Sequence, residues 1–246
     1  MEYQFLVLLI FGIAVGIYSV VIGGGMFFSV PFFQWMFPQL SFGAIIGNLK
    51  VGSFFRSIGS TASTLKQIDY PLSFKISGIA FVATIIGAYT ISGISQKWML
   101  PAVIFAVLLA VLAPRLAKKV SNKSFHFTSF FIGLYAGVFG AGIGILLIAL
   151  VRLKYPDDTS IAHVKIQARF VEWILVITAV IVHITSGNLL MEIWLPFSIG
   201  ALVGGFLGGE SLKRLGKLSG RIQKTVLYFA FTVAILVAAY KTFFPA

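Results

Sequence analysis

Residues Tyr3–Leu49 read YQFLVLLIFGIAVGIYSVVIGGGMFFSVPFFQWMFPQLSFGAIIGNL, 47 residues without an Asp, Glu, Lys or Arg and with Gly23-Gly24-Gly25 near the middle. A segment this long and apolar is expected to lie in lipid, or in protein that lipid surrounds. Three consecutive glycines fit a simple helix poorly, because each weakens a helix by about 1 kcal/mol relative to alanine. Irregular backbone is tolerated at membrane depth only where protein or a water-filled cavity covers it. The stretch therefore predicts a membrane protein with a site near Gly23–Gly25.

The composition of the whole chain indicates the same class. Of its 246 residues, 59% are hydrophobic and 11% are charged, whereas soluble domains carry about 25% charged residues. We therefore expect an all-α polytopic protein with about seven or eight spans of some 20 residues and the lipid bilayer as a partner. The net charge of +12 indicates basic loops facing an anionic cytoplasmic leaflet rather than a nucleic-acid-binding protein, because the basic clusters flank apolar segments.

The second half of the chain resembles the first. A shift of 119 residues aligns the two halves in order along both. We therefore predict two structural repeats, residues 1–120 and 121–246. The GxxxG pairs and the glycine run near residue 205 are expected to serve close helix packing. This shift places Gly23 and Gly25 on Gly142 and Gly144, Asn48 on Gln167, and Lys50 on Arg169, while Gly12-x-x-x-Gly16 recurs in the same order as Gly133-x-x-x-Gly137.

The basic loops constrain the topology. Eight plain crossings would put residues 115–123 and 213–224, both strongly basic, on opposite sides, although the positive-inside rule places both in the cytoplasm. The conflict disappears if residues 125–151 form a re-entrant hairpin broken near Gly140–Gly144. With a matching hairpin at Gly23–Gly25, each repeat is a hairpin plus three transmembrane helices, and the two repeats are inverted, as in many secondary transporters. The alternative is eight continuous transmembrane helices.

A helix that begins just after Gly23, Gly24 and Gly25 would present unpaired N–H groups and the positive end of its dipole near the middle of the membrane. Such an end binds anions without needing a side chain. Glycine lets the ligand approach the backbone and accepts positive φ. Gly142 and Gly144 are expected to supply the related half of the site in the second repeat.

Lys50 and Arg169 are the next candidates for binding an anion. Ionisable residues inside a membrane span are costly and are usually functional, and two matched cations could converge on one anion. The alternatives are that Lys50 extends to the nearer surface and that Arg169 pairs with Glu172 three residues later.

Four polar residues complete the candidate set. Asn48 and Gln167 can donate hydrogen bonds to an oxyanion, or can simply join helices. Arg56 has no acidic neighbour in its own segment, so its role is open, with coupling or gating as the hypothesis. Glu172 is the only acid inside a span; it is a candidate proton relay, or the partner of Arg169.

The sequence predicts no metal site, no cofactor and no enzyme. The chain contains no cysteine, and its histidines (His126, His163 and His183) form no metal-binding motif. The adjacent Asp157 and Asp158 lack the further oxygen ligands that a metal needs. The glycines are not followed by Gly-Lys-Ser/Thr, which argues against a nucleotide-driven pump.

Two sequence features resemble the sulfite exporter TauE/SafE family. The first is Gly12-Ile-Ala-Val-Gly16 followed by residues 22–31, IGGGMFFSVP, which look like the glycine-rich signature that leads to an apolar run and a proline. The second is the weaker match of residues 133–151 and 197–212 to the repeated signature, with Gly142-Ile-Gly144 lacking the full triplet. The resemblance implies a multi-pass carrier in the cytoplasmic membrane for sulfite, sulfoacetate or related anions.

We therefore predict a secondary transporter of a small anion, bound near the middle of the membrane by broken-helix N-termini and cationic side chains. One alternative is a passive anion channel. Another is a membrane scaffold subunit that transports nothing and uses its basic loops to bind acidic partners. The sequence leaves the coupling ion, the direction of transport and a homo-oligomer open.

Overall fold

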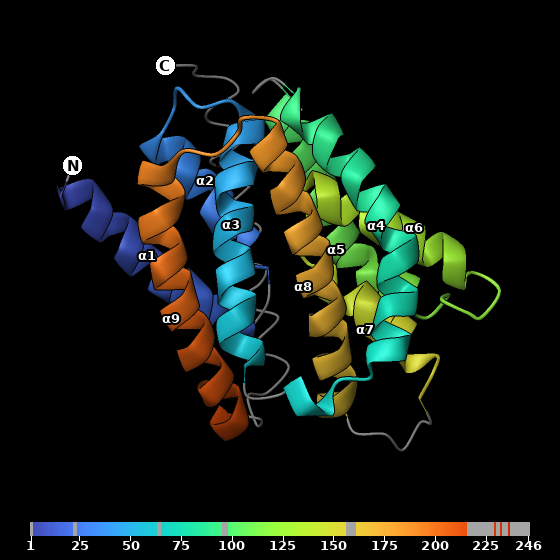
Figure 1. Ribbon diagram of the computed structural model, residues 1–246. Coiled ribbons are helices and arrows are strands. Elements are labelled where there is room, and N and C mark those ends of the chain that lie inside the picture. Colours follow the sequence, from blue (N-terminus) through green and yellow to red (C-terminus); the bar gives the residue numbers. More distant parts are fainter. Residues whose placement is uncertain are drawn as a thin grey trace.

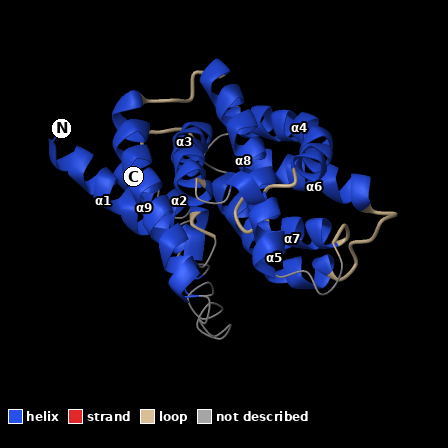
Figure 2. Cartoon of the chain, turned by 60° about the horizontal axis from the view of Figure 1, so that its bottom comes forward, coloured by secondary structure: helices blue, strands red, loops and turns tan. Residues whose placement is uncertain are grey.

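The computed structural model in Figure 1 describes residues 2–21, 24–62, 65–94, 98–155 and 161–215, together with positions 229, 232 and 236. The described residues form helices and no strand, as Figure 2 shows. The helices are α1 (Glu2–Val21), α2 (Met26–Met36), α3 (Phe42–Thr61), the short 3-10 helix η1 (Leu65–Gln67), α4 (Tyr70–Ser92), α5 (Met99–Ala117), α6 (Phe125–Val138), α7 (Gly144–Arg152), α8 (Ile161–Thr185) and α9 (Met191–Leu215).

Within the described residues, four helices are long and apolar enough to cross a membrane: α1, α4, α8 and α9. The shorter apolar helices include α6 and most of α5. The chain is therefore a multi-pass membrane protein, as its composition predicts. The apolar segment at residues 222–244, long enough for one more span, lies outside the described residues except for positions 229, 232 and 236.

Both glycine clusters interrupt their helices. α1 ends at Val21 and α2 begins at Met26, with Gly24 at φ +72°. α6 ends at Val138 and α7 begins at Gly144, with positive φ at Gly140 (+78°) and Gly142 (+77°). These angles favour glycine, because a side chain at positive φ is strained. The alternative of continuous helices through both clusters is therefore wrong. Gly23 lies outside the described residues, and the re-entrant course of the two broken segments stays a prediction.

Glycines bring two pairs of helices into close contact. On α1, a side chain at Gly12 would clash with the carbonyl of Phe197 on α9. On α6, a side chain at Gly133 would clash with the carbonyl of Ala80 on α4. Small residues let helix backbones approach in this way inside membranes. The packing role predicted for the GxxxG pairs is confirmed.

The helix contacts fall into two matched sets. α1 packs on α9 as α6 packs on α4, and α3 packs on α9 as α8 packs on α4. α2 contacts α3 as α7 contacts α8, and α3 contacts α8 at the centre. In Figure 1, α3 and α9 run downward while α4 and α8 run upward. In Figure 2, α1, α2, α3 and α9 lie on one side and α4 to α7 on the other.

Two helix starts are fixed by side-chain caps. Ser41 Oγ accepts the N–H of Ala44 at 3.1 Å before α3, and Asp69 Oδ1 accepts the N–H of Leu72 at 3.0 Å before α4. Caps of this kind satisfy N–H groups that have no partner within the helix. The Ser41 cap fixes the start of α3, the helix that carries Asn48, Lys50 and Arg56.

Candidate functional site

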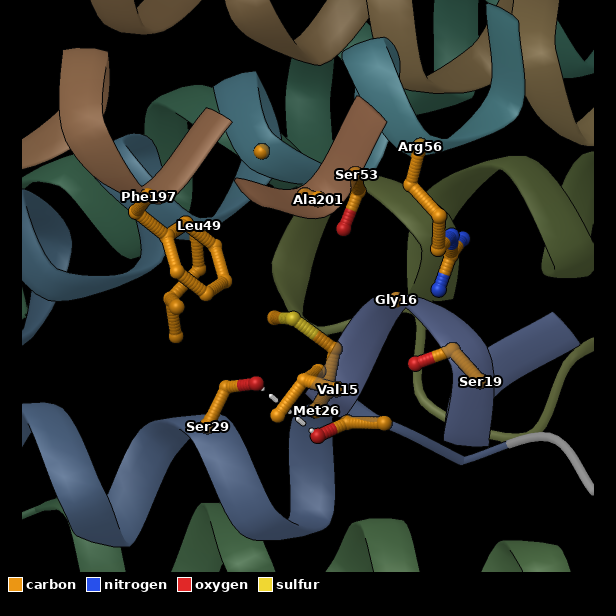
Figure 3. Close-up of a pocket in the computed structure, with 12 residues that line it drawn as sticks. Val15, Gly16, Ser19, Met26, Ser29, Leu49, Ser53, Arg56, Phe197 and Ala201 are labelled. Atoms are coloured by element: carbon orange, nitrogen blue, oxygen red, sulfur yellow. Dashed lines mark hydrogen bonds between the residues drawn. The ribbon is translucent and has the colours of Figure 1, made fainter. Parts of the chain in front are cut away.

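A pocket lies beside the first helix break. α1, α2, α3 and α9 all contribute to it, and Figure 3 shows Ser53 and Arg56 extending from α3 toward the α1 residues Gly16 and Ser19. The pocket is narrow, with room for about one water molecule. The lining residues are Val15, Gly16, Ser19, Gly25, Met26, Ser29, Leu49, Gly52, Ser53, Arg56, Phe197 and Ala201.

The polar groups of this pocket suit an anion. Arg56 is the only charged residue among those that line it. Ser19 Oγ is buried and has no hydrogen-bond partner among the described residues. Ser29 Oγ donates to the carbonyl of Gly25 at 3.0 Å. A guanidinium offers several fixed N–H donors that match oxyanions, and the hydroxyl of Ser53 lines the same space.

Gly25 determines how close the chain comes to itself in this pocket. It precedes Met26, the first residue of α2, so the pocket lies against the N-terminal end of that helix. A side chain at Gly25 would overlap Ser19 Oγ. The first N–H groups of a helix carry partial positive charge and bind anions. The N–H groups of Phe27 and Phe28 at this end donate to the carbonyls of Gly24 and Gly25. The binding role expected for these two glycines stays a prediction.

Arg56 pairs with Glu172 across the centre of the molecule. The Nη2–Oε1 distance is 3.2 Å, and the two side chains are 15% and 28% exposed. The pair joins α3 to α8. Glu172 therefore pairs with Arg56 and not, as one alternative had it, with Arg169. Spacing along one helix favoured Arg169 as the partner of Glu172, whereas packing of the two halves brings Arg56 closer to Glu172.

Lys50 and Arg169 bind the ends of the two broken helices. The buried Lys50 Nζ donates to the carbonyls of Ala136 (2.5 Å) and Phe139 (3.2 Å) at the end of α6. Arg169 Nη2 donates to the carbonyl of Val20 (2.8 Å) at the end of α1. Cations stabilise helix C-termini because the last carbonyls lack partners and carry partial negative charge. Each cation thus caps the broken helix of the other half of the chain. The structure directs them to different breaks.

Asn48 and Gln167 also form a matched pair, because each binds backbone groups of the opposite half of the chain. Asn48 Oδ1 accepts the N–H of Leu190 at 3.0 Å, directly before α9. Gln167 Oε1 accepts the N–H of Asp69 at 2.7 Å, directly before α4. Asn48 Nδ2 also donates to the carbonyl of Asn188, and Gln167 Nε2 to that of Gln67. Both amides therefore connect a central helix to a loop of the opposite half. This agrees with the alternative in which Asn48 and Gln167 join helices.

The second break differs chemically from the first. The shift of 119 residues places Val138 on Ser19, Ile148 on Ser29, Glu172 on Ser53 and Leu175 on Arg56. The Tyr135 hydroxyl donates to the carbonyl of Ala141 at 2.8 Å inside this break. A side chain at Gly140 would approach Lys50 Nζ, whereas one at Gly144 would meet open space. The polar lining of the first break is therefore not repeated at the second.

The sequence did not lead us to predict Ser19, Ser29 and Ser53 as residues of the site. Two signals were available: Ser19 and Ser29 flank the glycine triplet, and Ser53 lies three residues before Arg56. Residues three or four apart share one face of a helix, so Ser53 was predictable as a neighbour of Arg56. Within the described residues, no group of three His, Asp or Glu side chains could hold a metal ion.

Comparison with known proteins gives one match. The family model described as Sulfite exporter TauE/SafE matches residues 8–242. No curated protein and no solved structure matches the chain.

Proposed function

Since the chain belongs to the sulfite exporter TauE/SafE family, we propose that it is a secondary transporter of a small sulfur oxyanion or organosulfonate that binds at the break between α1 and α2. The observation that carries the proposal is the pocket beside this break, where Arg56 and the hydroxyls of Ser19 and Ser53 meet the start of α2. A positive group, hydroxyl donors and a helix N-terminus together form an environment that favours an anion.

The anion would contact Arg56, Ser19 and Ser53, together with the first turn of α2 near Gly25. Lys50 and Arg169 act at longer range: each caps a broken helix, and their positive charges add to the field that attracts the anion. Because the pocket is narrow, a bound oxyanion requires α1 and α2 to move apart from α3. Glu172 is the competing carboxylate that Arg56 releases when the anion arrives.

The two matched sets of helix contacts and the exchanged bonds of Lys50 with Arg169 and of Asn48 with Gln167 support two inverted repeats, residues 1–120 and 121–246. Inverted repeats around a central site permit alternating access, in which one part rocks against the other. By the positive-inside rule, the basic loops of such a carrier face the cytoplasm. A passive channel with the same pocket is the second candidate, favoured if the break stays open at both ends.

The first experiment is a thermal-shift screen of the purified protein with sulfite, sulfate, thiosulfate and short sulfonates. A ligand that binds only the folded state raises the melting temperature. Arg56→Gln should abolish the shift, whereas Arg115→Gln, which removes an exposed cation at the end of α5, should keep it. Absence of any shift in the wild type, or equal loss in both variants, would refute the assigned site.

Flux into liposomes distinguishes the mechanisms. A carrier shows saturable uptake that is accelerated by the same anion on the opposite side, whereas a channel shows flux that does not saturate and no counter-exchange. A scaffold subunit shows neither, even when it is well folded.

A further inference from the structure

A second, larger groove lies between the C-terminal ends of α5 and α7. It opens widely to the surface. Ala117, Val120, Ala149 and Leu153 line it with apolar groups, and Lys118 and Arg152 line it with positive charge. This groove is far in sequence from the pocket at the first break and shares no lining residue with it.

Lys118 and Arg152 give the groove its positive charge. From Tyr70 to Pro156 the sequence contains no Asp or Glu, and Asp157 and Asp158 follow directly after it. Exposed lysines at positions 119, 123 and 154 follow the same helix ends. The carboxylate that the structure brings to its edge is Asp69, which accepts the hydroxyl of Tyr155 at 3.0 Å. The groove therefore favours an anion, and by the positive-inside rule it faces the cytoplasm.

Exposed apolar side chains form a stripe along α5, the helix whose C-terminal end lines the groove. Phe105 (54% exposed), Leu108 (54%), Leu112 (40%) and Leu116 (37%) repeat at helical spacing. The stripe ends just before Lys118. A free phosphate would use only the cations, whereas a phospholipid would place its phosphate beside Lys118 and Arg152 and an acyl chain along the stripe.

We propose that this groove binds an anionic phospholipid of the cytoplasmic leaflet. The phosphate group contacts Lys118 and Arg152, the glycerol backbone lies over Ala149 and Leu153, and one acyl chain follows α5. Basic pockets at the cytoplasmic ends of membrane helices favour such headgroups. The proposal depends on the fold and not on which anion the protein transports.

The test compares lipid retention by two double variants that lose the same charge. Lys118→Gln with Arg152→Gln alters the groove, whereas Lys66→Gln with Lys75→Gln removes two basic residues outside its lining. Each variant, purified in neutral detergent, is titrated with phosphatidylglycerol and with phosphatidylcholine and analysed by native mass spectrometry. A basic residue near the surface contributes a factor of about 5 to anionic-lipid binding, so the groove variant should bind phosphatidylglycerol about 25-fold more weakly. The control, whose two lysines lie outside the groove lining, should bind phosphatidylglycerol nearly as tightly as the wild type.

Two results would overturn the proposal. Equal loss in the two variants would mean that general electrostatic attraction accounts for binding. Full competition by glycerol phosphate, which has no acyl chain, would mean that the groove binds a free phosphate group. Leu112→Asn provides a measurement that leaves every cation in place: it should weaken phosphatidylglycerol binding, and unchanged binding would contradict the acyl-chain path. Size-exclusion chromatography checks that each variant is folded.

Discussion

Replacing Glu172 by glutamine is expected to strengthen anion binding. In the structure, the Glu172 carboxylate pairs with Arg56, which lines the pocket at the first break. An entering anion must take the place of this carboxylate, so part of its binding free energy is lost in breaking the pair. Glu172→Gln keeps the shape of the side chain and removes the competing charge.

The magnitude follows from the geometry of the pair. A hydrogen bond to a charged group contributes about 1.5–3 kcal/mol net, whereas a fully exposed ion pair contributes about 0–1 kcal/mol. At 3.2 Å, with 15% and 28% of the two side chains exposed, the Arg56–Glu172 pair lies between these cases. We take about 1.5 kcal/mol, which corresponds to about a tenfold change in the dissociation constant.

The assay is the titration of the melting temperature with the anion that the screen identifies. Glu172→Gln should reach half of its maximal shift at about one tenth of the wild-type concentration, by the same conversion. Glu192→Gln, an exposed acid in the first turn of α9, provides the matched control and should behave as the wild type. If Glu172→Gln binds the anion equally well or more weakly, Glu172 does not compete for Arg56 and the reasoning fails.

Three further predictions concern the scaffold. Lys50→Met should lower the free energy of unfolding by about 2–5 kcal/mol, because two buried carbonyls lose their partner. Thermal unfolding in detergent measures this loss, with Lys118→Met as the control. If Lys50→Met still responds to the anion, the role of Lys50 is helix capping. Gly12→Ala should destabilise the protein by more than about 2 kcal/mol, because the added methyl group clashes with α9. Gly78→Ala, whose methyl group meets nothing within 4 Å, should be neutral or stabilising. Equal losses of stability in the two variants would contradict the close packing of α1 on α9. In whole cells, Ser186→Cys should react with a membrane-impermeant maleimide and Lys118→Cys should not. The opposite pattern would mean that the protein has the reverse orientation in the membrane.

The sequence predicted the class of the fold and both helix breaks because their causes are local. Long apolar segments require helices in lipid, and glycine clusters permit the positive φ that Gly24 and Gly140 adopt. The match of Lys50 with Arg169 was also visible as a shift of 119 residues. What these cations touch was not predictable, because their partners lie in the opposite half of the chain and belong to the backbone.

The pocket was harder to predict for a related reason. It gathers residues from four helices, and serine in a membrane helix usually bonds its own preceding carbonyl, as Ser57 does with Ser53. Only packing distinguishes such a serine from Ser19, whose hydroxyl has no partner among the described residues. The partner of Arg56 was missed because Glu172 is 116 residues away in sequence.

The matched bonds and the unmatched pocket together constrain how the protein works. Lys50 and Arg169 each cap a helix of the opposite half, and Asn48 and Gln167 each bind a loop of the opposite half. Two related repeats would produce this pattern. The polar lining of the pocket occurs at one break only, since Leu175 takes the place of Arg56 at the other. A symmetric scaffold can rock between two equivalent arrangements, whereas a single charged site avoids holding two mutually repelling anions in low dielectric. We therefore expect one anion for each chain, carried at the first break while the caps keep both broken helices in place.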